Sequence, residues 1–215
     1  MGSVSVQRGG KYISLSNGFE IDQNDVVKTS KQGSIRLEFV DGTTVSLGKF
    51  STFSIPEYGY DAKVSSKAQL SFSRGVFLVA TGQIGKLSPQ KFKIKLKNAT
   101  IGIRGTTILG ETSSKKDFVA CEDGAITVSN KQGSVDLLAG QSTEVKPSSA
   151  PSKPAVTTVK DKGVLMDSFS PTRESKSSGG SNVSGQISNR ADVKNTTNIA
   201  IGKDNKATVG SIIIE

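Results

Sequence analysis

The chain has 215 residues, of which 34% are hydrophobic and 22% are charged, and this length suits one sizeable domain with a solvated extension. It holds no histidine and one cysteine, which excludes an intramolecular disulfide, a histidine-based nucleophile pair and the usual zinc or iron ligand sets. No apolar run reaches about 18 residues, so we expect no membrane-spanning helix. The composition predicts a protein that is not an enzyme and that uses no metal or other cofactor.

The formal net charge is +9, and the excess lies mainly in the first hundred residues, where 14 Lys and Arg stand against 7 Asp and Glu. Clustered lysines would suit an anionic partner, because they raise the local potential by several kT. The same lysines spread evenly would only keep the protein soluble. The sequence leaves both interpretations open.

Short runs of alternating apolar and polar residues fill the first 146 positions, with turn residues between them. Helical periodicity is almost absent, and many of the 23 glycines mark turns. A spacing of roughly 8 to 12 residues between such runs is typical of a β-sandwich or barrel. We therefore expect an all-β domain with strands at 12–15, 25–29, 34–39, 43–47, 52–55, 68–72, 76–81, 92–96, 100–103, 106–111, 117–122, 125–129, 134–138 and 141–145.

The clearest predicted hairpin covers residues 35–47, where Asp41-Gly42 stands between two alternating runs. An Asp-Gly pair favours a type I′ turn, which needs φ above zero at both residues. In the first strand, a period of two places apolar side chains in the core and charged ones in water. The inward residues are Ile35, Leu37 and Phe39, and the outward residues are Arg36 and Glu38.

Four lysines alternate with three apolar residues in the next prominent run. In a strand, this period of two gives one cationic face and one apolar face. The cationic residues are Lys91, Lys93, Lys95 and Lys97, and the apolar residues are Phe92, Ile94 and Leu96. Two roles fit this pattern: the lysines either block edge-to-edge aggregation of a solvent-facing strand, or form a docking strip for an acidic partner or an anionic envelope polymer.

The composition changes after residue 146, which we expect to end the domain. Three prolines among Ser and Lys between 147 and 154 remove backbone donors, so residues 147–181 are expected to form a linker. Within it, Val164–Phe169 could pack back on the domain as one short segment, and the Ser- and Gly-rich stretch from 170 to 181 has the composition of disorder.

The last segment, 182–215, is predicted to be a β-prone tail with strands at 198–202 and 208–212. An apolar, β-branched tail after a linker can add a strand to a sheet edge, in its own molecule or in a neighbour, and the second case would make a homo-oligomer. The residues expected to carry this strand addition are Ile199, Ile201, Val209, Ile212, Ile213 and Ile214.

Residues Ala99–Thr106, reading Ala-Thr-Ile-Gly-Ile-Arg-Gly-Thr, join an alternating strand to a compact Gly-Arg-Gly segment. This octapeptide resembles the centre of the FecR domain family, and further motifs resemble the family in the same order. They are Asp25–Thr29, the hairpin from Leu37 to Gly48, Gly75–Phe77, and Glu122–Val128 together with Leu138–Gln141. The resemblance covers about 18–145 and implies an antiparallel Greek-key or roll-like β-sandwich, here followed by the linker and the tail.

Within the octapeptide, Gly102 and Gly105 flank two residues, so the backbone there can bend or approach another strand closely. Arg104 then has two possible roles. Its guanidinium could clamp the bend by capping carbonyls or by pairing with Asp41 or Asp123, or it could bind a carboxylate or phosphate ligand. We expect the structural role for the family motif, which consists of Gly102, Arg104, Gly105 and Thr106.

The same glycine spacing fits the GXXG loop of KH domains, which bind nucleic acid. That loop joins two helices, and none is evident at this point of the sequence, so no nucleic-acid partner is expected. The single cysteine, Cys121, is expected to be a buried and inert thiol, because no histidine can act as its base.

The resemblance implies an exported bacterial protein, periplasmic or at the cell surface, that acts through protein contacts as an interaction or signalling module. Its partner would be an envelope or surface protein or an acidic envelope polymer. FecR proteins of the signalling type pass a receptor's state to an anti-sigma segment through one membrane helix, and neither segment is evident here, so the iron-signalling role is not carried over.

The alternative is a structural protein of the cell surface whose C-terminal strands complement a neighbouring subunit. No leader precedes the first predicted strand, and the Met-Gly-Ser opening is typical of a chain whose leader has been removed, although a cytoplasmic protein would look the same.

Overall fold

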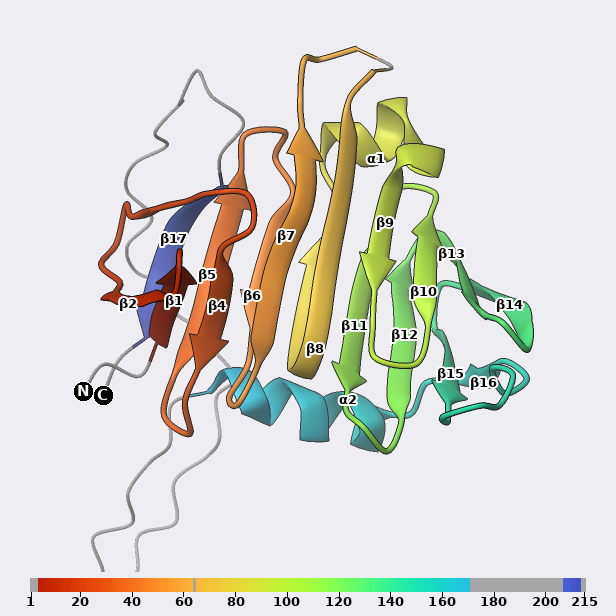
Figure 1. Cartoon of the computed structure of the whole chain (residues 1–215). Helices are drawn as coiled ribbons and strands as arrows, with labels where there is room; N and C mark the ends of the chain where they lie inside the picture. Colours follow the sequence, from red (N-terminus) through yellow and green to blue (C-terminus); the bar gives the residue numbers. More distant parts are fainter. Residues whose placement is uncertain (1–3, 64, 171–206, 214–215) are drawn as a thin grey trace, which may run out of the picture.

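The computed structural model describes residues 4–63, 65–170 and 207–213, and two β-sheets with a common strand make up most of this part of the chain (Figure 1). From edge to edge, sheet A contains β2 (Lys11–Ser14), β1 (Val4–Arg8), β4 (Val26–Thr29), β7 (Thr52–Gly59), the first half of β8 (Lys67–Ala80), β9 (Phe92–Lys95), β10 (Thr100–Ile103), β13 (Ala125–Asn130) and β14 (Gly133–Leu138).

Sheet B contains β3 (Glu20–Ile21), β17 (Ala207–Ile213), β5 (Ser34–Phe39), β6 (Thr44–Leu47), the second half of β8, β11 (Thr107–Thr112), β12 (Asp117–Asp123), β15 (Gln141–Val145) and β16 (Ala155–Val156). Neighbouring strands run antiparallel, apart from β8 and β9, which run parallel. The predicted antiparallel β-sandwich is confirmed. Helix is limited, within the described residues, to α1 (Gln83–Leu87), η1 (Pro89–Lys91), α2 (Val159–Met166) and η2 (Asp167–Phe169).

Strand β8 passes from sheet A to sheet B at Gly75. The sequence predicted two strands here, at 68–72 and 76–81, and the structure joins them into one. Gly75 has a φ of +99°, and the hydroxyl of Ser51 packs against it and donates to the carbonyl of Val76 at 3.0 Å. The bend reverses which residues of β8 face inward, so that Phe72 and Phe77 both enter the core and stack with their ring centroids 4.3 Å apart. The alternation of apolar and polar residues alone predicted two separate strands, whereas the chain forms one strand that bends at Gly75.

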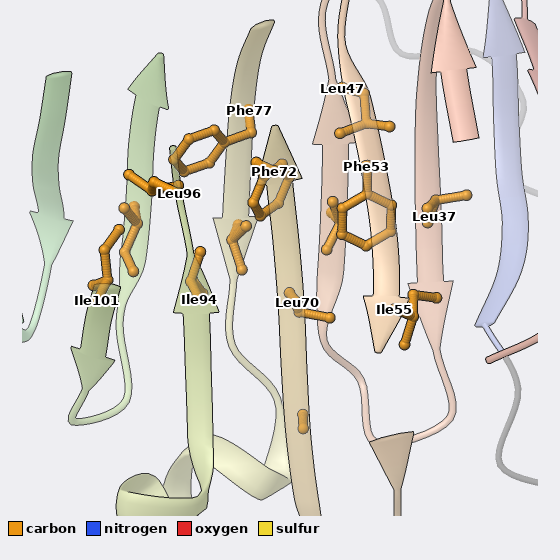
Figure 2. Packing of buried hydrophobic residues seen from close by; sticks show 14 of the residues in the cluster. Leu37, Leu47, Phe53, Ile55, Leu70, Phe72, Phe77, Ile94, Leu96 and Ile101 are labelled. Carbon is orange, nitrogen blue, oxygen red and sulfur yellow. The ribbon is translucent and has the colours of Figure 1, made fainter. Parts of the chain in front are cut away.

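The apolar faces of the two sheets meet in a single core, and Figure 2 shows part of it, with side chains from both sheets pointing toward one another. Its largest fully buried members include Phe53, Phe72, Phe77 and Phe92. Burying an aromatic or large aliphatic side chain of this kind stabilises a fold by about 1.5–3 kcal/mol. The inward residues of the predicted hairpin belong to this core, since Ile35, Leu37 and Phe39 are at most 4% exposed.

The hairpin of β5 and β6 forms as predicted, but its turn type is different. Gly42 has a φ of +80°, whereas Asp41 is not among the residues with positive φ. The amide of Gly42 donates to the carbonyl of Phe39 at 2.9 Å, and the amide of Phe39 donates to the carbonyl of Thr43 at 2.9 Å. This is a type I turn followed by a glycine in the left-handed region, not the expected type I′ turn. The physical reason is loop length: the strands close between Phe39 and Thr43, and the resulting three-residue loop favours this turn, whereas type I′ suits a two-residue loop.

Residues 147–170 are a strap that crosses the outer face of sheet B, and the expectation of a plain linker is wrong for this part. Strand β16 pairs with β15, and α2 begins with a capping box between Thr158 and Asp161. Leu165 is buried against Val76 and Leu109 on the outer face of the sheet. In Figure 1 the strap runs along one end of the sheets, from β15 to the β5 side.

The strap ends beside β5. The amide of Lys49 donates to the carbonyl of Ser168 at 3.0 Å, and the hydroxyl of Ser34 donates to the carbonyl of Phe169 at 3.3 Å. The packing of Leu165 and Phe169 agrees with the expectation that Val164–Phe169 could pack back on the domain. Residues 171–181 of the expected linker lie outside the described residues.

The C-terminal strand β17 pairs with β5 and β3 of its own chain, so one predicted strand of the tail forms next to the edge strand of sheet B. Its backbone includes Val209, Ile212 and Ile213 of the predicted strand-addition residues. Ile199, Ile201 and Ile214 lie outside the described residues, together with the predicted strand at 198–202.

Candidate functional site

The four predicted lysines lie on and around β9, which is in the middle of sheet A and not at an edge. Strand β8 flanks β9 on one side and β10 flanks it on the other. Along β9, Phe92 and Ile94 are buried while Lys93 and Lys95 are exposed. Lys91, in η1, and Lys97, after the strand, are exposed as well. Protection of a free edge is therefore not the role of these residues, because β9 has no free edge. We call the four residues Lys91, Lys93, Lys95 and Lys97 the lysine strip.

The strands beside the lysine strip present small and uncharged side chains. Gln69 and Ser71 of β8 are the register partners of Lys93 and Lys95. On the other side, Gly102 and Thr100 of β10 oppose the same two lysines. A Cβ added at Gly102 would have no neighbour closer than the Thr127 carbonyl at 4.0 Å, so the glycine leaves room beside Lys93 and is not demanded by packing. The lysine strip is therefore flanked by uncharged side chains on both sides, so that an extended peptide can lie along it.

A shallow hollow opens at the β7 side of the strip, with a volume of about 470 Å³. Lys67 and Glu57 form an ion pair at its wall, with Nζ and Oε1 2.5 Å apart. The residues that line the hollow are Glu57, Ser65, Lys67, Ala68, Gln69, Gln90, Lys91 and Lys93. Three lysines against one glutamate make this hollow cationic, so it extends the anion-attracting surface of the strip.

The family octapeptide forms β10 and the turn after it. Gly105 has a φ of +73°, which explains why a glycine is needed at the bend. The amide of Thr106 donates to the hydroxyl of Thr81 at 2.8 Å, and the amide of Thr81 donates to the carbonyl of Thr106 at 3.0 Å. Gly124 lies so close that a Cβ there would come within 3.0 Å of the Gly105 carbonyl oxygen. The motif therefore braces the end of β8 against the β12–β13 turn.

Arg104 does not clamp this bend. It is exposed, and it makes no hydrogen bond or ion pair to another residue in the part of the chain that the structure describes. Of its two suggested partners, Asp41 is buried among other donors. Asp123 lies close to the motif, opposite Thr107, but does not pair with Arg104. Backbone geometry at Gly105, with the Thr81–Thr106 pairing, holds the bend without it.

Asp41 is instead the centre of a buried hydrogen-bond cluster that sequence reasoning did not identify. It is 3% exposed, and its carboxylate accepts from the hydroxyls of Tyr58 and Thr43 at 2.9 and 2.8 Å. The amides of Thr43 and Ile84 donate to it as well, each at 3.1 Å. The cluster ties the β5–β6 turn to β7 and to the start of α1. The residues Asp41-Gly42-Thr43 indicated a turn in the sequence, but nothing in it indicated that the Asp41 carboxylate is a buried acceptor.

Burial first, and then the nearby Asp41 carboxylate, raise the pKa of Tyr58 above its ordinary value of 10.0. The fold therefore favours the neutral phenol, so this contribution to stability is complete below pH 10 and is lost as the pH rises above it, by up to about 1.4 kcal/mol per pH unit. We expect the Tyr58→Phe variant to lose less stability than the wild type between about pH 10 and pH 12 in urea unfolding. The control is Tyr12→Phe, which removes the hydroxyl of a side chain that is 65% exposed and lies outside the core. Equal alkaline losses in wild type and Tyr58→Phe would contradict this account.

The described residues contain no arrangement that suggests catalysis or a metal centre. Cys121 is fully buried, and burial, with Asp123 nearby, raises the pKa of its thiol, so the reactive thiolate is disfavoured. No group of three or more potential metal ligands comes together in this part of the chain. Over the same residues, no helix combines the length and the apolar character that crossing a membrane would require.

Comparison with known proteins gives one family and one fold. The sequence profile described as FecR protein matches residues 25–135. Two crystal structures of a proposed anti-sigma factor from Parabacteroides distasonis ATCC 8503 have a similar fold, each with a TM-score of 0.53, at 12% and 13% identity. The similarity covers 66% of this chain, which spans 64% and 63% of the two crystallised chains. No curated protein sequence matches. Because the profile extends over half of the chain, from β4 into β14, this protein belongs to the FecR family.

Proposed function

We propose that this chain is a non-enzymatic binding module of the bacterial cell envelope, exported to the periplasm or the cell surface, which docks an acidic protein partner on its lysine strip. The observation that carries the proposal is the central position of β9, where Lys93 and Lys95 are exposed between two hydrogen-bonded neighbours. Because β9 has a paired strand on each side, edge protection does not account for these lysines, and this supports a docking role.

The spacing of the strip supports an extended acidic ligand. Lysines two residues apart on a strand are about 7 Å apart. This is shorter than the Debye length of about 8 Å at physiological salt, so their potentials add. Ser71 and Thr100 beside Lys95 can donate hydrogen bonds to the same ligand. A segment with carboxylates at alternate positions matches this row better than a single small anion does.

The family supports a role in signalling through protein contacts. The structures with the same fold are described as those of a proposed anti-sigma factor, and we extend a regulatory role of that kind to this chain. The partner is then an envelope or surface protein.

Reversal of the four charges tests the proposal. We expect the K91E/K93E/K95E/K97E variant to bind poly-L-glutamate, a model acidic polypeptide, at least about fourfold more weakly than the wild type, because each of the four exposed ion pairs contributes roughly 0.2–1 kcal/mol. The salt dependence of binding, measured by fluorescence anisotropy, should become shallower at the same time.

A second quadruple variant, K31E/K131E/K146E/K160E, is the control, since these lysines are exposed and lie outside the strip. It carries the same net charge, so equal losses in both variants would show an effect of net charge alone and would contradict the proposal. Tighter binding of an acidic polysaccharide such as polygalacturonate than of polyglutamate would point to an envelope polymer as the partner.

A structural role in a surface assembly is the second candidate, favoured by the position of β17 between β5 and the two-residue edge strand β3 of sheet B. In this case the C-terminal strand complements a neighbouring subunit. The molecular mass of the full chain, measured by light scattering over a range of concentrations, separates the two: a constant monomer mass would argue against assembly.

A further inference from the structure

Strand β17 lies between two strands that are otherwise not paired with each other. Ala207 and Thr208 pair with Ile21 and Glu20 of β3, and the whole strand pairs with β5 on its other side, from Ala207 opposite Phe39 to Ile213 opposite Ser34. Among the described residues, β17 is the only strand partner of β3. We call the space between β3 and β5 the acceptor slot, because it offers backbone donors and acceptors on both sides to an inserted strand.

Both walls of the acceptor slot are held by contacts that do not involve β17. The β5 wall pairs with β6 on its other edge and sends Ile35, Leu37 and Phe39 into the core. The β3 wall is fixed by the fully buried side chain of Ile21.

Arg8 also holds the β3 wall. Its guanidinium donates to the Glu20 carbonyl at 2.9 Å and to the buried carboxylate of Asp25 at 2.6 Å. An inserted strand therefore meets a preformed site, and its own backbone is the part that must become ordered.

The segment that connects the strap to β17 is much longer than the distance that it has to span within its own chain. The strap ends beside Ser34, because the Ser34 hydroxyl donates to the Phe169 carbonyl. Strand β17 starts at the far end of β5, opposite Phe39, so the chain must return over one six-residue strand, or about 17 Å. Residues 171–206 stand between the two points, and a segment of that length can span up to roughly 120 Å. The acceptor slot of an adjacent copy is within this distance.

We propose that the acceptor slot of one copy takes up the β17 strand of a second copy, so that chains at high local concentration become linked by strand exchange. The strand pairings are the same in both states, and the states differ only in chain entropy. Insertion into the chain's own slot is unimolecular, whereas insertion into the slot of a second copy is bimolecular, so exchange between copies increases with protein concentration. This inference deepens the assembly candidate and is independent of the lysine strip, which lies on sheet A.

Disulfide trapping between full-length chains tests the exchange. Thr208 of β17 and Glu38 of β5 are register partners, and Glu38 is exposed. One chain carries Thr208→Cys and the other, marked by an affinity tag, carries Glu38→Cys, while Cys121 stays buried in both. We expect a mixed disulfide dimer whose yield rises with protein concentration and is at least about tenfold above that of the control pair, Thr208→Cys with Ser134→Cys. Ser134 is exposed on β14, at an edge of sheet A.

The other outcomes overturn the inference. A mixed-dimer yield equal to that of the control shows random collision. An internal disulfide in the T208C/E38C double variant without any mixed dimer shows that β17 stays in its own chain. No disulfide in either experiment shows that the β17–β5 pairing itself does not form. The lysine-strip variants still bind or fail to bind polyglutamate in each of these cases, so the two proposals fail separately.

Discussion

The Gly75→Ala variant is expected to lose about 4 kcal/mol or more of its free energy of unfolding, which is a large part of the stability of a typical domain. Gly75 has a φ of +99°, a backbone conformation that alanine adopts only under strain. An added Cβ would also come within 3.0 Å of the Ser51 backbone Cα and of its hydroxyl oxygen. Gly75 is the hinge at which β8 passes between the sheets. Gly75 and Ser51 therefore cannot move apart without displacing a sheet.

Urea unfolding followed by circular dichroism measures the loss, and Gly140→Ala is the matched control. Gly140 has a φ of +83°, but nothing lies within 4 Å of the position of its missing Cβ. The control should therefore lose only the free energy that alanine costs in a left-handed backbone conformation, about 1–2 kcal/mol. Similar losses in the two variants would mean that the contact with Ser51 contributes nothing, and that the hinge interpretation is wrong.

The Asp41→Ala variant is expected to lose about 3–5 kcal/mol, because the substitution removes the acceptor of four buried or partly buried hydrogen bonds. The amides of Thr43 and Ile84 would be left without a partner, and each unsatisfied buried donor costs about 1–3 kcal/mol. The Tyr58 and Thr43 hydroxyls would lose an acceptor as well, although they can rotate.

Asp136→Ala is the control for this change. Asp136 also accepts from a threonine hydroxyl, that of Thr127 at 2.6 Å, but on an exposed surface. Its removal should change the free energy of unfolding by less than about 0.5 kcal/mol. A loss for Asp41→Ala as small as that of the control would show that water or a rearranged backbone replaces the carboxylate, and that the cluster is not a structural centre.

Local patterns in the sequence predicted several elements well. The bounds of β5, β10 and β15 agree with the prediction residue for residue. For β5 and β10 the reason is an uninterrupted alternating run between turn residues. The pattern failed where structure depends on distant residues. Strand β1 was missed at the start of the chain. In the strap, the packing of 164–169 was expected, but β16 and α2 were not, because prolines and lysines dominate the sequence before them.

The candidate site shows the same division. Alternation placed Lys93 and Lys95 on a polar face, and the structure agrees on their exposure. It could not tell a central strand from an edge strand, because that depends on the pairing of β9 with β8 and β10. Arg104 was expected to hold a bend that backbone conformation at Gly105 holds by itself.

The sequence by itself determined the fold class, the family and the absence of histidine-based chemistry, because these follow from residue counts, local alternation with a period of two, and motifs in a fixed order. Only the tertiary structure decided that β9 is a central strand, that Asp41 is a buried acceptor, and that β17 lies between β3 and β5. The physical reason is that alternation is a property of neighbouring residues, whereas strand pairing and the satisfaction of buried polar groups join residues that are far apart in the chain.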